Sequence, residues 1–173
     1  MAETTPVREL IAIRAPLERC WALSTRVELV QKTLGMKVVD GVSKGFVAGG
    51  DRVVWKGWKF GLPTTHHTLI SGFQPPHEER QGDRVIRLAF FQDTQESGRF
   101  EWFAHEHTLI EEHGQNGELI TVLKDKVTYS LDLGRFSDHI STYILAPHIC
   151  KLMRRRFKLI KELAEGDGWR EWM

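Results

Sequence analysis

The 173-residue sequence is poor in cysteine, nearly balanced in charge and free of long apolar runs, and each of these absences excludes a class of protein. Cys20 and Cys150 are too few for a disulfide framework or for a thiolate metal cluster with CxxC spacing, so we expect a protein of the reducing cytoplasm. The 24 basic and 23 acidic residues give a formal net charge of +1. Because there is no basic surplus, nucleic acid is not an expected partner.

Segments typical of targeting or of membrane insertion are also missing. The N-terminal MAETTPVREL lacks a basic region followed by an apolar run, and no window approaches the roughly 18 apolar residues of a spanning helix. Signatures of phosphate binding or of a serine nucleophile, such as GxGxxG, the Walker loop and GxSxG, do not occur. We expect a single domain over residues 1–173, with a core at about 7–165, a tail at 166–173 and no stable membrane insertion. The composition favours no particular oligomeric state.

The first part of the chain has the pattern of a strand followed by two short helices. Alternation over residues 7–13 predicts the strand, and Pro16 with the apolar positions after it predicts a helix over 16–23. Thr25 and Glu28 have capping-box spacing for a second helix, which Gly35 would end.

The rest of the chain reads as a meander of strands and then one long helix. Strand-like segments separated by Gly, Pro and Asp occur at 36–42, 51–60, 66–73, 84–91, 100–110 and 118–133. From Ser137 or Asp138 to about Glu165, apolar residues recur at three- and four-residue steps. This spacing predicts a long helix that Pro147 bends and Gly166 stops. Trp169 and Trp172, in the tail, would either rest on the body or anchor a partner.

This order of elements resembles the START and birch-pollen-allergen (Bet v 1-like) superfamily, also called SRPBCC, over roughly residues 7–163. IAIRAPLERCWAL resembles its opening strand and first helix, and GDRVVW and ISGFQPP resemble its third strand and the turn after its fourth. FFQDTQESGRFEWFAHEH and LITVLKDKVTYSLDLG are similar to the H-x-H and Asp-x-Val-x-Tyr strands of a bacterial branch. Arg99 and Leu131-Asp132 depart from that branch, but only at turns.

The resemblance implies an α+β helix-grip fold, in which a seven-stranded curved antiparallel sheet, with two short helices after its first strand, grips a long C-terminal helix. It also implies a hydrophobic cavity between sheet and helix for a lipid, polyketide, sterol or similar molecule. Some members of the superfamily are aromatase/cyclases, whereas others transfer lipids or sense hormones. The fold alone does not choose among these activities.

The segment GRFEWFAHEHTLIEEHG contains three of the eight histidines, and its register against the next strand decides where they point. His105 and His107 share one face of a strand, and Asp125 shares a face with mostly apolar neighbours that should point inward. A two-residue turn would pair Glu106 with Asp125, whereas a loop one residue longer would pair His107 with Asp125. We prefer the longer loop because an imidazole beside a carboxylate leaves neither buried group unpaired. The alternative is that these residues are structural or lie on the convex face.

We therefore expect the binding or transfer of a hydrophobic small molecule. The residues expected to line the site are Phe90, Phe103, His105, His107, Leu123, Asp125, Val127, Tyr129, Tyr143, Pro147 and Phe157, although each apolar one could equally be core. The alternative is a cyclase or dehydratase in which His107 and Asp125 are acid–base partners.

A cupin-like metalloprotein is the third hypothesis. The segment from Gly98 to Glu111 comes close to the first cupin motif, but the later histidine and asparagine of the second motif have no counterpart on a strand. We therefore expect no metal and no cofactor. His66 and His67 point to opposite faces of a strand, so each is expected at a rim or surface.

Overall fold

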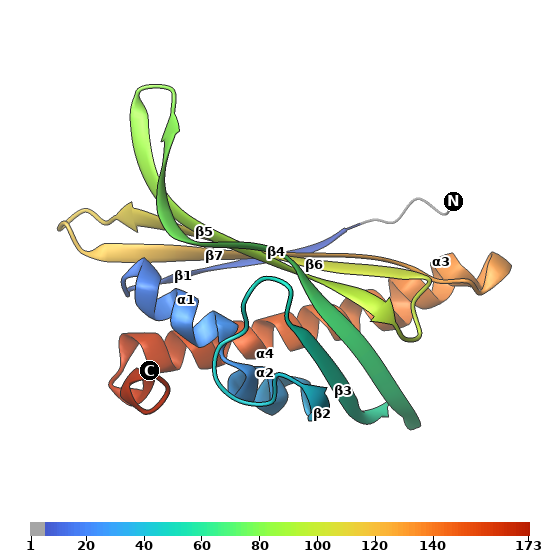
Figure 1. Cartoon of the computed structure of the whole chain (residues 1–173). Coiled ribbons are helices and arrows are strands. Elements are labelled where there is room, and N and C mark those ends of the chain that lie inside the picture. Colours follow the sequence, from blue (N-terminus) through green and yellow to red (C-terminus); the bar gives the residue numbers. More distant parts are fainter. Residues whose placement is uncertain (1–5) are drawn as a thin grey trace.

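The computed structural model describes residues 6–173, and its main feature is one curved, seven-stranded sheet (Figure 1). Every neighbouring pair is antiparallel, in the order β1-β7-β6-β5-β4-β3-β2. The strands are β1 (Val7–Ile13), β2 (Lys37–Gly41), β3 (Arg52–Lys59), β4 (Leu62–Gln81), β5 (Arg84–Ser97), β6 (Trp102–His113) and β7 (Leu119–Ser130). The predicted α+β helix-grip architecture is confirmed.

The main helices lie together on one side of this sheet (Figure 1). They are α1 (Leu17–Thr25), α2 (Val27–Leu34) and α4 (Ala146–Glu165). The chain also has the short helix α3 (Ser137–Ile140), a π-helical segment η2 (Ser141–Leu145) and the 3-10 turns η1 (Gly134–Phe136) and η3 (Gly168–Glu171). Among residues 6–173, none of these helices combines the length and the apolar character that crossing a bilayer requires.

The ends of α2 show one correct and one wrong prediction. Gly35 ends the helix in the left-handed conformation (φ 64°), and its N–H donates to the carbonyl of Gln31, as a glycine C-cap does. The capping box is wrong, because Thr25 is the last residue of α1 and its hydroxyl donates to the Trp21 carbonyl (3.0 Å). Glu28 instead accepts the Gly45 N–H (3.1 Å).

The long C-terminal helix forms as α3, η2 and α4 in direct continuation, from Ser137 to Glu165. A helical proline removes one backbone donor and crowds the preceding turn. Here Pro147 stands in the first turn of α4 directly after the π-helical segment, in which the Ala146 N–H donates to the Ser141 carbonyl. The wider turn accommodates the proline, so the helix continues through it.

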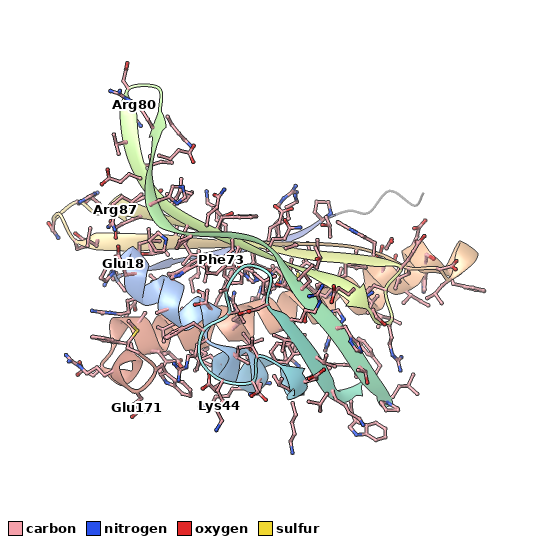
Figure 2. All side chains as sticks on the ribbon, viewed as in Figure 1. Glu18, Lys44, Phe73, Arg80, Arg87 and Glu171 are labelled. Atoms are coloured by element: carbon pink, nitrogen blue, oxygen red, sulfur yellow. The ribbon has the colours of Figure 1, made fainter. Side chains whose placement is uncertain are left out.

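The hairpin of β4 and β5 is longer than predicted. We expected a turn at Pro75-Pro76, but both prolines lie inside β4, within a register shift between Gln74 and His77. A bulge tolerates residues that cannot donate to the ladder, so the strands continue to the Gly82-Asp83 turn. The far part of this hairpin stands away from the rest of the molecule (Figure 1), with Arg80 close to its tip (Figure 2).

Apolar residues from the sheet and the helices pack into three clusters. The first cluster fills one end of the space between the sheet and the helices. The first cluster comprises Ile13, Ala15, Leu17, Cys20, Leu23, Leu29, Ala89, Leu109, Leu123, Phe157, Ile160 and Ala164. Trp169 and Trp172 pack against it, so the tail rests on the body. The second comprises Val7, Val127, Tyr129, Leu145, Ile149 and Met153, and the third Val27, Met36, Val47, Val53, Trp55 and Ile70.

The β6–β7 hairpin has the longer loop that we preferred. The Gly114 N–H donates to the Glu118 carbonyl (2.8 Å), which leaves a three-residue loop, and Gly117 has a positive φ of 76°. This register pairs His107 directly with Asp125 and is confirmed.

Replacing Gly117 with alanine should lower the free energy of unfolding by about 1 kcal/mol, because a Cβ disfavours the left-handed conformation. Urea titration of the unaltered chain and of the variant measures this difference in the free energy of unfolding. Gln115→Ala, at an exposed position in the same loop, is the matched control and should change stability by less than about 0.5 kcal/mol. Equal stabilities of the two variants would contradict the loop geometry.

Candidate functional site

A cavity of about 980 Å³ lies between the sheet, α2 and α4, at the upper end of the size range of small-molecule sites. The second and third clusters supply much of its wall, whereas none of the described buried residues of the first cluster reaches it. Representative apolar lining residues are Val30, Val53, Trp55, Ile70, Phe91, Ile149, Leu152 and Met153. The cavity is thus the part of the interlayer space that the core leaves unfilled.

Five ionisable residues from three neighbouring strands and α4 meet at the wall of this cavity. The β5–β6 pairing sets Asp93 opposite His105, and the β6–β7 pairing sets His107 opposite Asp125. Side chains two apart share a face of a strand, so all four point to the same side of the sheet. Arg156 reaches them from α4.

Asp125 is the centre of this group and its side chain has no exposed surface. Its Oδ1 lies 2.9 Å from Nδ1 of His107, and its Oδ2 lies 3.1 Å from Nε2 of His105. Arg156 donates from Nη1 to Oδ2 over 2.9 Å. Burial alone would raise the pKa of this carboxyl, but the interactions with His107, Arg156 and His105 hold the pKa well below its usual range. Asp125 is therefore a carboxylate that accepts from three donors.

Arg156 connects α4 to β6, β7 and α1 through one buried guanidinium. Besides Asp125, it donates from Nη2 to the carbonyl of Ser24 in α1 (3.2 Å). Its Nη1 also lies 3.2 Å from Nδ1 of His107. The guanidinium is almost fully buried, so without Asp125 it would be an unpaired buried charge. The ion pair therefore stabilises the packing of α4 against the sheet at this point.

The two histidines present their remaining nitrogens to Asp93 on the cavity side. Nε2 of His107 lies 3.2 Å from Oδ1 of Asp93, and Nδ1 of His105 lies 3.9 Å from the same oxygen. Burial, and then the nearness of His107, lower the pKa of His105 despite its carboxylate neighbours. Burial would raise the pKa of Asp93, but its hydrogen bond with His107 and the nearby His105 lower it overall, so Asp93 is ionised.

The position of the His107 ring is fixed on both sides. It stacks on Phe91 with ring centroids 4.0 Å apart and planes 16° from parallel. The His105 ring lies beside it at 3.8 Å. Since Asp125 accepts the N–H of one nitrogen on each ring, the other nitrogens can exchange a proton with a guest or hold a cation. Asp93, His105 and His107 each offer one donor atom, and these atoms lie within 4.8 Å of one another.

The structure brings some of the expected ligand-binding residues to the cavity wall. Phe103, His105, His107 and Val127 line it. Asp125 lies behind the histidines, and Leu123, Tyr129 and Phe157 are buried in the core clusters. The Tyr129 hydroxyl bonds to the Ser141 hydroxyl (2.8 Å) rather than to the cavity.

Three of the expected lining residues are wrong. Phe90 lies on the outer face of β5, because its neighbour Phe91 is the one that pairs opposite His107. Tyr143 is 70% exposed and packs on His139, and Pro147 is also exposed. Both fall where the π-helical segment shifts the helical periodicity, so the spacing that we used did not identify the buried face there.

Sequence reasoning missed Asp93, Arg156 and two further histidines. Arg156 belongs to the basic run KLMRRRFKLIK, which reads as a solvated face, but it lies three residues after Met153 and so shares that buried stripe. His66, expected at a rim, lines the cavity beside Phe103, with ring centroids 5.4 Å apart. His148 lines it from α4.

Two other candidate groups take no part in this site. Burial raises the pKa of the Cys20 thiol to about 11, so it stays protonated at neutral pH and is a poor nucleophile. Glu111, the acidic residue of the cupin-like motif, accepts the Leu17 N–H (2.9 Å) and pairs with Arg87. It caps α1 and does not join the histidines, so the cupin-like reading of Gly98 to Glu111 is wrong.

Arg156→Met should lower the free energy of unfolding by about 3 kcal/mol, because it leaves the buried Asp125 carboxylate without its cationic partner. Arg155→Met is the matched control. That neighbouring arginine is exposed, and its loss should change stability by less than about 0.5 kcal/mol. Urea unfolding measures the free energy of unfolding of both variants. If both lose a similarly small amount of stability, the buried Arg156–Asp125 pair does not hold α4 on the sheet.

No protein-family model matches the chain, and no curated protein is recognisably similar to it in sequence. Solved structures match in shape. A START superfamily protein from Mycobacterium smegmatis has a TM-score of 0.58 at 8% identity, over 91% of this chain and 97% of its own. Norcoclaurine synthase from Thalictrum flavum, in complex with dopamine and hydroxybenzaldehyde, has a TM-score of 0.56 at 11% identity, over 92% of this chain and 88% of its own.

Ara h 8.0201 has a TM-score of 0.55 at 12% identity, over 94% of this chain and 98% of its own. At such low identities the likeness concerns the fold. With its curved sheet, long C-terminal helix and intervening cavity, the chain has the helix-grip fold of the START and Bet v 1-like (SRPBCC) superfamily.

Proposed function

We propose that this protein binds an apolar small molecule, of the lipid, polyketide or sterol-like class, in the cavity between the sheet and the C-terminal helix. The observation that carries this proposal is a cavity of about 980 Å³ with mainly aliphatic and aromatic walls, in which Asp93, His105, His107 and Arg156 form a compact charged group. Burial of an apolar guest against such walls supplies the binding free energy, and the few polar groups orient it.

The entrance of the cavity suits an apolar guest as well. Phe60 in the β3–β4 turn, Leu62 at the start of β4, Leu133 just before η1 and Ile144 in η2 line the cavity, and each is about half exposed. Exposed apolar side chains that gather at an opening favour contact with apolar molecules. The Phe60 ring also lies 4.8 Å from the ring of His148 on α4, so the turn touches the helix beside this opening.

The charged group determines how such a guest would lie. Asp93, His105, His107 and Arg156 all line the cavity. An oxygen function at one end of the guest would meet these donors and acceptors, while the hydrocarbon part lies against the opposite apolar walls.

A cyclase or dehydratase is the second candidate, because His105 and His107 expose ring nitrogens at the cavity wall. His107 would exchange the proton with the substrate. Asp125 does not reach the cavity and would act through His107, so it would be a positioning residue rather than the catalytic partner that the sequence suggested.

Native mass spectrometry of protein purified from its own host should detect one apolar molecule retained per chain. Mild denaturation should release it. Incubation of the purified protein with the released molecule then separates the two candidates, because a binding protein returns the molecule unchanged, a dehydratase lowers its mass by that of water, and a cyclase changes its chromatographic retention even where the mass stays the same. A chain that retains no molecule and does not bind the released fraction would contradict both candidates.

Leu152→Trp should weaken the binding of 1-anilinonaphthalene-8-sulfonate (ANS) about tenfold or more, because the larger ring takes up volume in the cavity. Leu10→Trp introduces the same ring at an exposed position of β1 and is the matched control. Fluorescence titration measures both. If the two variants bind the dye equally well, the cavity is not where it binds.

A further inference from the structure

We propose that Asp93, His105 and His107 form a binding site for a divalent first-row transition-metal ion at the wall of the cavity. The site combines two imidazoles and one carboxylate, a ligand set that suits Zn²⁺, Fe²⁺ and related ions. It differs from the cupin-like motif, because its carboxylate comes from β5, the strand paired with the histidine strand.

The three donor atoms already stand close to the spacing that an ion requires. Ligand atoms about 2.1 Å from one ion lie about 3.0–3.4 Å apart for bond angles between octahedral and tetrahedral. Oδ1 of Asp93 lies 3.2 Å from Nε2 of His107 and 3.9 Å from Nδ1 of His105, and all three donor atoms fall within 4.8 Å of one another. A small rotation of His105 would complete the set.

Asp125 orients both imidazoles for this task. Its Oδ2 lies 3.1 Å from Nε2 of His105 and its Oδ1 lies 2.9 Å from Nδ1 of His107, so it holds one nitrogen of each ring. The opposite nitrogens, Nδ1 of His105 and Nε2 of His107, face Asp93, and an ion that binds there displaces any proton that they carry. A carboxylate behind a ligating histidine is the usual outer partner in metal sites, and here one carboxylate serves two histidines.

The local charge also favours a cation. Asp93 and Asp125 contribute two negative charges to a largely buried group, and Arg156 compensates one of them through its contact with Asp125. Among residues 6–173, the ionisable partners of Asp93 are the imidazoles of His66, His105 and His107, so its charge is the one left for an ion. The competing arrangement is a doubly protonated His107 that bridges both carboxylates without any ion.

The open side of the site faces the cavity, since all three ligating residues line it. With three protein ligands, an ion keeps at least one position for water or for an oxygen atom of a guest. Metal binding itself needs no guest, so it can be tested separately from the function proposed above.

The test uses the full chain, treated with a chelator and then titrated with Zn²⁺ in competition with a chromophoric chelator. Titration with Co²⁺, followed by visible absorption, reports the coordination directly. We expect one ion per chain. Asp93→Asn and His105→Ala should each weaken Zn²⁺ binding at least about 100-fold, and Asp125→Asn, which removes the outer partner, about 10- to 100-fold.

The matched control is His148→Ala, which removes an imidazole from the same cavity but from α4, beside Phe60. It should bind Zn²⁺ as the unaltered chain does. Asp93→Asn keeps the shape of a partly exposed side chain, and thermal melting checks that every variant is folded.

Two outcomes would overturn the proposal. One is an unaltered chain that binds neither Zn²⁺ nor Co²⁺, which would support the protonated His107 bridge. The other is Asp93→Asn and His105→Ala variants that bind as tightly as the His148→Ala control. ANS binding that persists without metal binding would refute the metal site and leave the ligand-binding function standing.

Discussion

The buried carboxylate of Asp125 is the constraint on which the rest of the site depends. A charge without exposed surface is very costly unless donors surround it, and here two imidazoles and one guanidinium do so. These three partners come from β6 and α4, so one side chain links the sheet to the helix that closes the cavity. The same contacts select which nitrogens of His105 and His107 face the guest.

The cavity results from an uneven distribution of large side chains along the interlayer space. At one end, α1 and the last turns of α4 bring Leu17, Leu23, Phe157 and Ile160 against the sheet and fill it. Toward α2 and the start of α4, apolar residues line the walls without meeting. Folding stability can therefore come mainly from the filled end, whereas the open end keeps the volume that binding requires.

Much of the fold could be predicted because its signals are local. Alternation, glycine positions and the three- and four-residue spacing identify the strands, the stop at Gly35 and the terminal helix. The pairing of His107 with Asp125 was also predictable, because only that register avoids two facing carboxylates. The length of β4 was not, since a bulge around Pro75 and Pro76 depends on the partner strand.

The rest of the site depends on contacts distant in sequence. Asp93 joins the histidines only through the β5–β6 register, and no local pattern indicates that register. Arg156 is one of three consecutive arginines, and only the position of α4 on the sheet shows which of them is buried.

The projecting hairpin has a consequence for encounters between molecules. Among residues 6–173, β4 pairs with β3 as far as Leu69, and Ile70 bonds to Gly50 and Asp51. The residues of β4 beyond Ile70 form an edge that could accept a strand from another chain. Pro75 and Pro76 interrupt the regular succession of backbone donors in this part of β4, because proline has no N–H. Beyond them, Glu78, Glu79 and Arg80 add exposed charges that a neighbouring strand would have to accommodate. A long ribbon can thus extend from the molecule while its composition discourages edge-to-edge aggregation.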